Sequence, residues 1–134
     1  MAPPVDPGPP SYVRIVADAD GTTRFADVDP HYEVVPPEPG VAELWVGAGV
    51  PVDRLHVLTV LAHQQKPDWH RAPRRQFVVF LDGWVRLTTS DGEQRHLPAG
   101  SVLLVEDTTG DGHVTEHEPG TRRVLVIPLA PDPD

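Results

Sequence analysis

Cysteine is absent from the 134 residues, and lysine and arginine together number only 11 against 20 aspartates and glutamates. The absence of cysteine excludes disulfides and thiolate metal ligands. The net charge of −9 argues against binding to nucleic acid or to an anionic membrane surface, because both require a basic face. No apolar run approaches the roughly 20 residues of a membrane span, and the first residues lack the pattern of a secretory signal. We therefore expect a cytoplasmic protein that binds neither nucleic acid nor membrane.

Proline, in contrast, is abundant and unevenly placed. Of the 17 prolines, five fall within the first ten residues, which predicts an extended or disordered arm over residues 1–10. Residues 130–134 read as a similar polar tail. The segment between them, residues 11–129, is long enough for one domain with one core.

Short apolar runs separated by glycine and proline predict an all-β fold, and no segment has a clear helical period. Asp82 and Gly83 favour a tight turn that joins strands 76–81 and 84–89 as a hairpin. Ser90-Asp91-Gly92 marks another reversal. The other expected strands are 12–17, 41–46, 54–62, 102–106, 113–118 and 122–129.

Two runs, 77–81 and 102–105, are apolar on both faces. A strand with one wet face would instead alternate between apolar and polar residues. We expect both faces of these strands to be covered, and a homodimer is a natural way to cover the outer one.

The spacing of polar residues around the first turn carries a family resemblance. Six residues separate Gln76 from Gly83, and His70 lies six positions before Gln76. This resembles the first motif of the cupin family, which reads Gly, five residues, His-x-His, three or four residues, Glu, six residues, Gly. In this register Gln76 replaces the glutamate, Ala72 the second histidine and Gln64 the leading glycine.

A second stretch resembles the other cupin motif, Gly, five residues, Pro-x-Gly-x-x-His, three residues, Asn. Gly100 is followed by five residues and Glu106 in the proline position, then by a longer loop before His113, and His117 stands in the asparagine position. Residues 69–76 and 106–113 are also similar to tracts shared by a group of small cupins. The resemblance covers about the central third of the chain and implies an antiparallel cupin-type β-barrel, a double-stranded β-helix or jelly roll.

The cupin register implies a metal site, but a depleted one. A full cupin site supplies three imidazoles and one carboxylate to Fe, Mn, Ni or Zn. Here the implied ligands are His70, Gln76 and His113, and a neutral amide binds a divalent cation more weakly than a carboxylate does. We therefore predict a weak or absent divalent metal. His63 and His117 could extend the ligand set, since His113, Thr115 and His117 share one face of a strand.

The function that this resemblance implies is a small-molecule enzyme of lyase, isomerase or cyclase type, acting by proton transfer in secondary metabolism. His70 and His113 would be the catalytic residues. An arginine of the 71–75 cluster would orient an anionic substrate. The candidate substrate-binding residues are Arg71, Arg75, Gln76 and Trp84, although Trp45, Trp69 and Trp84 also suit a core.

Two other functions stay open. One is a metal-dependent cupin dioxygenase, and the other is a non-catalytic cupin that binds a small ligand. The loop 106–109 could supply a general base beside His113, but its composition favours a turn whose side chains cap their own backbone.

Overall fold

The computed structural model describes residues 12–28, 31–61 and 66–131. These residues form β-strands, and none of their segments is a helix long and apolar enough to cross a membrane. The strands are β1 (Tyr12–Ala17), β2 (Thr23–Val28), β3 (Tyr32–Val35), β4 (Leu44–Gly47), β5 (His56–Val60), β6 (Gln76–Phe80), β7 (Val85–Thr89), β8 (Gln94–Leu97), β9 (Val102–Val105), β10 (His113–His117) and β11 (Arg122–Pro128).

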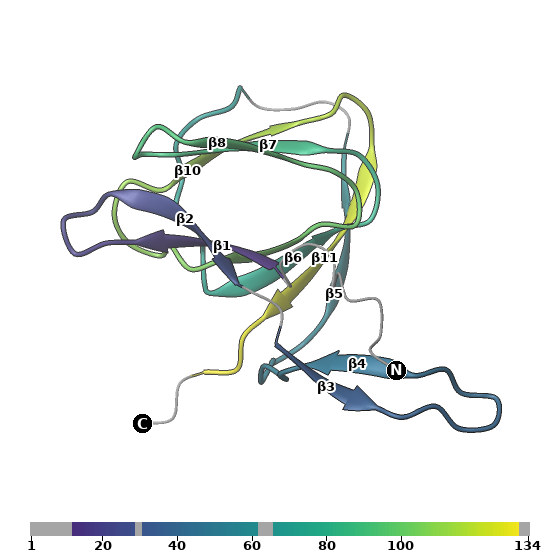
Figure 1. Cartoon of the computed structure of the whole chain (residues 1–134). Coiled ribbons are helices and arrows are strands. Elements are labelled where there is room, and N and C mark those ends of the chain that lie inside the picture. Colours follow the sequence, from purple (N-terminus) through teal and green to yellow (C-terminus); the bar gives the residue numbers. More distant parts are fainter. Residues whose placement is uncertain (1–11, 29–30, 62–65, 132–134) are drawn as a thin grey trace.

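The strands make three sheets (Figure 1). A six-stranded sheet has the order β2-β1-β9-β6-β11-β5, and a three-stranded sheet has the order β10-β7-β8. The strands β3 and β4 form a separate two-stranded sheet. The expected all-β class is therefore confirmed. Each of the eight expected strands overlaps an observed one, whereas β2, β3 and β8 were not expected.

Two features differ from an antiparallel barrel. None of the sheets closes on itself within the described residues, and β1 pairs with β9 in parallel. The predicted Asp82-Gly83 hairpin is also wrong, because β6 and β7 lie in different sheets. A tight hairpin turn of this kind needs positive φ at both central residues, but only Gly83 has it, at 72°. The turn instead carries the chain from one sheet to the other. The reversal at residues 90–92 does connect paired strands, β7 and β8.

The hydrophobic core lies between the six-stranded and three-stranded sheets. Ile15 from β1 and Val85 and Leu87 from β7 are almost fully buried. Because strand side chains alternate between faces, Val78 and Phe80 of β6 point to this interior and Phe77 points away. Phe77 is nevertheless buried, and its ring lies edge-on to Tyr12 with centroids 5.0 Å apart. The expectation of cover on both faces of β6 is thus met at Phe77, and a residue of the same chain supplies part of the cover.

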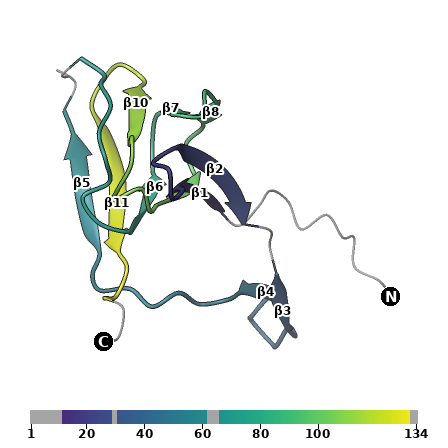
Figure 2. The same cartoon turned by 90° about the vertical axis from the view of Figure 1, so that its left-hand side faces the viewer.

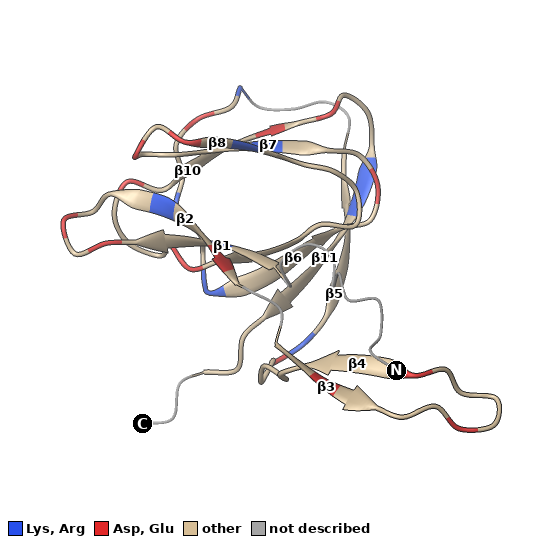
Figure 3. Cartoon of the chain, viewed as in Figure 1, with Lys and Arg blue, Asp and Glu red and all other residues tan. Residues whose placement is uncertain are grey.

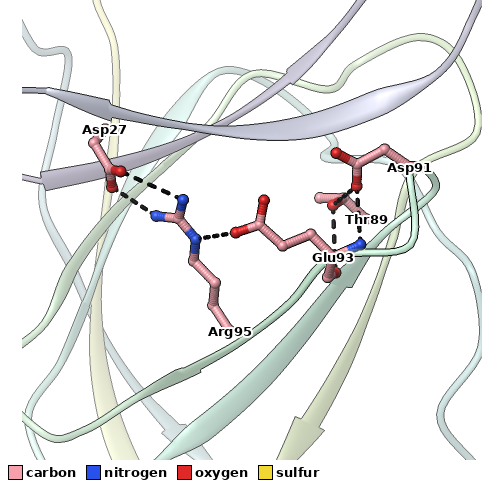
Figure 4. A network of polar contacts seen from close by, with 5 residues as sticks. All are labelled: Asp27, Thr89, Asp91, Glu93 and Arg95. Atoms are coloured by element: carbon pink, nitrogen blue, oxygen red, sulfur yellow. Dashed lines mark hydrogen bonds and ion pairs between the residues drawn. The ribbon is translucent and has the colours of Figure 1, made fainter.

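A polar network joins the free edges of the two sheets (Figure 4). Arg95 on β8 donates to both carboxylate oxygens of Asp27 on β2, at 2.6 and 3.3 Å, and to Glu93 at 2.6 Å. The guanidinium also lies 4.8 Å from the centre of the Phe25 ring. The hydrogen bonds to Asp27 are the main reason that the pKa of Arg95 is raised above its ordinary value. This network holds β8 over β2, and so helps to hold the two sheets together at one side of the core.

The β3–β4 pair projects from this two-sheet body (Figures 1 and 2). Among the described residues between Phe25 and Ala72, none is buried. The segment between β4 and β5 is fixed to the body, because Asp53 N donates to Pro128 O and Ala130 N donates to Pro51 O. The β3–β4 pair itself is left largely uncovered along its length.

Candidate functional site

A cavity of about 550 Å³ lies between the two large sheets. Most of its wall is apolar and comes from strands of both sheets, with a few polar side chains among them. The polar residues of the wall are Gln76, His70, His113, Thr115 and His117, with Lys66 and Asp68 beside them. The predicted convergence of His70, Gln76 and His113 on one cavity is confirmed by this lining, although their roles stay predictions.

His70 and His113 are brought together by the backbone. Each donates its N–H to the carbonyl oxygen of the other, at 3.0 and 2.9 Å. The imidazole centroids are 4.6 Å apart, with the ring planes at 57°. His70 is exposed, and its Nδ1 lies 3.2 Å from the carbonyl oxygen of Asp68. His113 is only 5% exposed. The site thus pairs one solvent-facing histidine with one buried histidine.

Asp107 fixes the buried histidine. Its Oδ2 lies 2.6 Å from Nδ1 of His113, and Asp107 is fully buried. The backbone carbonyl of Asp107 also accepts from Ala72 N at 3.1 Å. A carboxylate at Nδ1 favours the tautomer in which Nδ1 carries the proton and Nε2 is the basic nitrogen. The sequence-based preference for a self-capping turn at Asp107 is therefore wrong.

Gly112 allows this arrangement. Thr23 is fully buried, and its hydroxyl donates to the carbonyl oxygen of Gly112 at 2.7 Å. A Cβ at Gly112 would overlap the carbonyl oxygen of His70, and the residue has a φ of +78°. Only glycine at position 112 therefore lets the loop before β10 approach the segment around His70 closely enough for His70 and His113 to form their two backbone hydrogen bonds.

The third histidine of the cavity is His117. The predicted shared face of His113, Thr115 and His117 is confirmed, because all three line the cavity. Burial lowers the pKa of His117 to about 4, and the positive charges of Arg122 and of protonated His70 act in the same direction. His117 is consequently neutral near pH 7. His63 and Gln64 lie outside the described residues.

The predicted substrate-binding arginines do not line the cavity. Arg71 Nε donates to the carbonyl oxygen of Gly110 at 2.6 Å, and the side chain is exposed. Arg75 donates to Glu106 Oε2 at 2.9 and 2.7 Å. Burial alone would raise the pKa of Glu106, but hydrogen bonds from Arg14 and Arg75 outweigh it and hold this pKa below its usual value. Both arginines are thus directed toward the 106–110 loop.

Two tryptophans lie in environments that differ from those the sequence predicted. Trp84, a predicted substrate-binding residue, does not line the cavity and instead stacks on His96 with centroids 5.0 Å apart. Trp69, expected in the core, is 47% exposed and lines the cavity next to His70. The position of Trp69 in a polar, proline-containing tract rather than in an apolar run was the signal for this placement.

Metal binding at the cavity stays a prediction. Within them, no three histidine, aspartate or glutamate side chains are grouped so that they could hold an ion. The resemblance-based set of His70, Gln76 and His113 has no anionic member, and a divalent cation prefers anionic ligands. Zn, Ni, Fe or Mn binding therefore stays a prediction of low affinity.

Comparison with known proteins does not assign this chain to a family. The chain matches no protein-family profile and no curated protein. One similar solved structure is the crystal structure of protein NMB1881 from Neisseria meningitidis, with a TM-score of 0.43 and 13% sequence identity over 75% of this chain and 84% of the other. This degree of likeness carries no argument about fold or function.

We expect Gly112→Ala to lower the free energy of unfolding by more than Gly92→Ala does. Both glycines have positive φ, +78° and +96°, so each alanine carries a strain of about 1–2 kcal/mol. Only at Gly112 does the new Cβ meet backbone, which adds about 1–3 kcal/mol. Urea unfolding of both variants measures the difference. Equal losses would show that the close approach to His70 is not maintained in solution.

We also expect His117 to lower the free energy of unfolding as the solution becomes acidic. Its pKa is lowered to about 4 in the folded state, from an ordinary 6.5. Its contribution to stability is therefore present above pH 6.5 and is lost as the pH falls toward 4. Between pH 7 and 4, the free energy of unfolding of His117→Gln should fall by about 1–2 kcal/mol less than that of wild type. This difference is kept small because the ring is only half-buried and solvent screens its charge. Urea midpoints across this range provide the measurement, and parallel curves for the two proteins would contradict the expectation.

Proposed function

We propose that this chain is a small cupin-type enzyme that moves protons on a small, neutral and largely apolar molecule, in a reaction of lyase, isomerase or cyclase type. The observation that carries the proposal is the buried contact between His113 Nδ1 and Asp107 Oδ2 at the wall of the cavity. A histidine held in this way is a general base with a fixed orientation.

The chemistry follows from the tautomer. With the Nδ1 proton directed at Asp107, Nε2 of His113 is left to accept a proton from a bound molecule. The imidazolium that then forms is stabilised by the adjacent carboxylate. His70, whose ring lies 4.6 Å away, is available to return a proton at a second atom. Proton removal at one atom and delivery at another is the requirement of an isomerase or lyase.

The cavity wall supports the substrate class. Its apolar residues are Val78, Phe80, Leu87, Leu103, Val105 and Val124, among others. Arginine is absent from this lining within the described chain, and Lys66 is exposed, so an anionic group among the buried apolar residues would have no arginine to pair with. A volume of about 550 Å³ suits an ordinary small molecule. We therefore favour a neutral substrate over the anionic one that the arginine cluster suggested.

The cupin assignment rests on the motif register. The positions that match the two motifs, His70 and Gln76 in the first and His113 in the second, line one cavity although 36 residues separate Gln76 from His113 along the chain. The His70–His113 bridge supports the same alignment of the two motifs. A jelly-roll relationship between the two sheets is proposed on this basis.

Nitrobenzisoxazole is a suitable probe, because it is neutral and its ring opens when a base removes one C–H proton, releasing a coloured phenolate as the N–O bond breaks. We expect wild type to accelerate this reaction, and we expect the acceleration by His113→Gln to be about 10²–10⁴-fold smaller. Asp107→Asn should also lose activity, because it no longer fixes the tautomer. His96→Gln is the matched control, since His96 is exposed and stacks on Trp84 outside the cavity. If wild type and His113→Gln react at the same rate, His113 is not the base. Binding of the probe without turnover would instead favour a ligand-binding protein.

Gln76→Glu should tighten zinc binding at least about tenfold, because a carboxylate adds a full negative charge at ligand distance with little change in size. Calorimetric titration of zinc into wild type and variant gives the comparison. Gln94→Glu is the control, since Gln94 is exposed on β8 and donates to Thr88. Equal affinities for wild type and Gln76→Glu would mean that Gln76 is not a ligand. A tight wild-type site would mean that His63 or His117 takes part.

A further inference from the structure

The exposed apolar side chains of this protein are concentrated in one segment. Of the thirteen large hydrophobic residues that are exposed in the described chain, eleven lie between residues 34 and 61. Monomeric proteins normally scatter such residues over the surface. The eleven are Val34, Val35, Val41, Leu44, Val46, Val50, Val52, Leu55, Val57, Leu58 and Leu61.

The projecting strands β3 and β4, here called the arm (residues 32–47), carry apolar side chains on both faces, with Glu33 opposite Val46 on one of them. The register pairs Val34 with Trp45 on one face and Val35 with Leu44 on the other. Tyr32 and Trp45 contact each other across the first face, with ring centroids 6.0 Å apart. A two-stranded hairpin is at best marginally stable by itself in water. The arm therefore needs cover that the described part of the chain does not supply, because its side chains are largely exposed.

The strand β5 presents a second uncovered surface. Within the described residues it is the last strand of the six-stranded sheet, and its one partner strand there is β11. Four of its five residues are exposed, and Val57 is 64% exposed. A free, apolar edge strand is a ready site for another β-strand to add to the sheet.

We propose that a second copy of this chain covers both surfaces, with the arm of each protomer packed against β5 of the other in a two-fold dimer. Each chain carries both halves of the contact, so that one two-fold axis satisfies both arms and both edges and closes the assembly. This inference does not depend on the proposed chemistry of the cavity.

The size of the exposed surface fits a dimer. Complete burial of one valine or leucine removes roughly 60–120 Å² of apolar surface. The eleven residues are 37–64% exposed, and so leave roughly 300–700 Å² of apolar surface in total. A standard interface buries about 800 Å² on each partner, of which a little over half is apolar. Residues 34–61 also supply about the 20–30 residues that each side of such an interface contains.

Charge favours the same arrangement. The arm carries Glu33, Glu38 and Glu43 and no lysine or arginine (Figure 3). At the foot of β5, Arg74 lies beside a hollow of about 330 Å³ that is also lined by Asp53, Pro128 and Leu129. Arg74 forms no ion pair with any residue in the described ranges. An acidic arm from the partner would place carboxylates near this cation.

The dimer would also complete the cavity. Val60 at the end of β5 and Leu61 beyond it belong to the cavity wall, and Leu61 is 54% exposed. An arm that adds to the edge of β5 would cover the outer side of this wall. Dimerisation and closure of the cavity would then depend on the same strand.

Sedimentation velocity between about 1 and 100 μM tests the proposal. Wild type should sediment at twice the 14.7 kDa of one chain. The arm variant Leu44→Glu/Val46→Glu should weaken self-association at least about 100-fold, because two charges would enter an apolar contact. The edge variant Val57→Arg should weaken it similarly. Leu81→Glu is the matched control, since Leu81 is 39% exposed but lies outside residues 34–61, and it should remain dimeric.

An equimolar mixture of the arm variant and the edge variant gives the decisive result. In that mixture one arm–edge contact is unaltered and the other pairs glutamate with arginine, so a dimer should form again. Recovery of the dimer also shows that both variants are folded. A monomeric wild type, a dimeric arm variant, or a mixture that stays monomeric while circular dichroism shows intact strands would each overturn the proposed arrangement.

Discussion

The contact between Asp107 and His113 is the constraint on which the rest of the site depends. Asp107 has no exposed surface, and a carboxylate in that position is costly unless it is paired. Its side chain holds His113 while its backbone holds Ala72, so one residue connects the loop before β10 to the segment before β6. The His70–His113 bridge then extends the same connection by two hydrogen bonds. One buried aspartate thus helps to hold the two segments that carry the imidazoles.

Strand positions could be predicted where local patterns are strong, and strand partners could not. The apolar runs of β6 and β9 and the β-branched run of β11 identified those strands from their composition alone. The strand β8 has the sequence Gln-Arg-His-Leu, which contains no apolar alternation, and only its pairing with β7 makes it a strand. The Asp82-Gly83 turn was misread because its local chemistry suits a hairpin equally well. The choice between a hairpin and a crossing to the other sheet is made by tertiary packing.

For the site, motif spacing identified the histidines but not their environment. His70, Gln76 and His113 do line one cavity, as the spacing of the two motifs predicted. Asp107 was set aside because an aspartate in a glycine-containing loop usually caps a turn. The contacts that hold it are made with His113 and with Ala72 N, and Ala72 lies 35 positions earlier in the chain, so the local sequence does not reveal them. Arg71 and Arg75 were misjudged for the same reason, since their acceptors in the 106–110 loop lie more than 30 positions away.

The parallel pairing of β1 with β9 has a consequence for the order of folding. Val13 lies beside Leu103, although the two are 90 positions apart in the chain. The strand β1 therefore lacks this neighbour until β9 has been synthesised. Contacts of such high sequence separation pay a loop-closure entropy before they gain any packing, and they are associated with slow folding. During synthesis the β1–β2 hairpin therefore keeps one strand edge open until β9 is available, and an open strand edge favours aggregation.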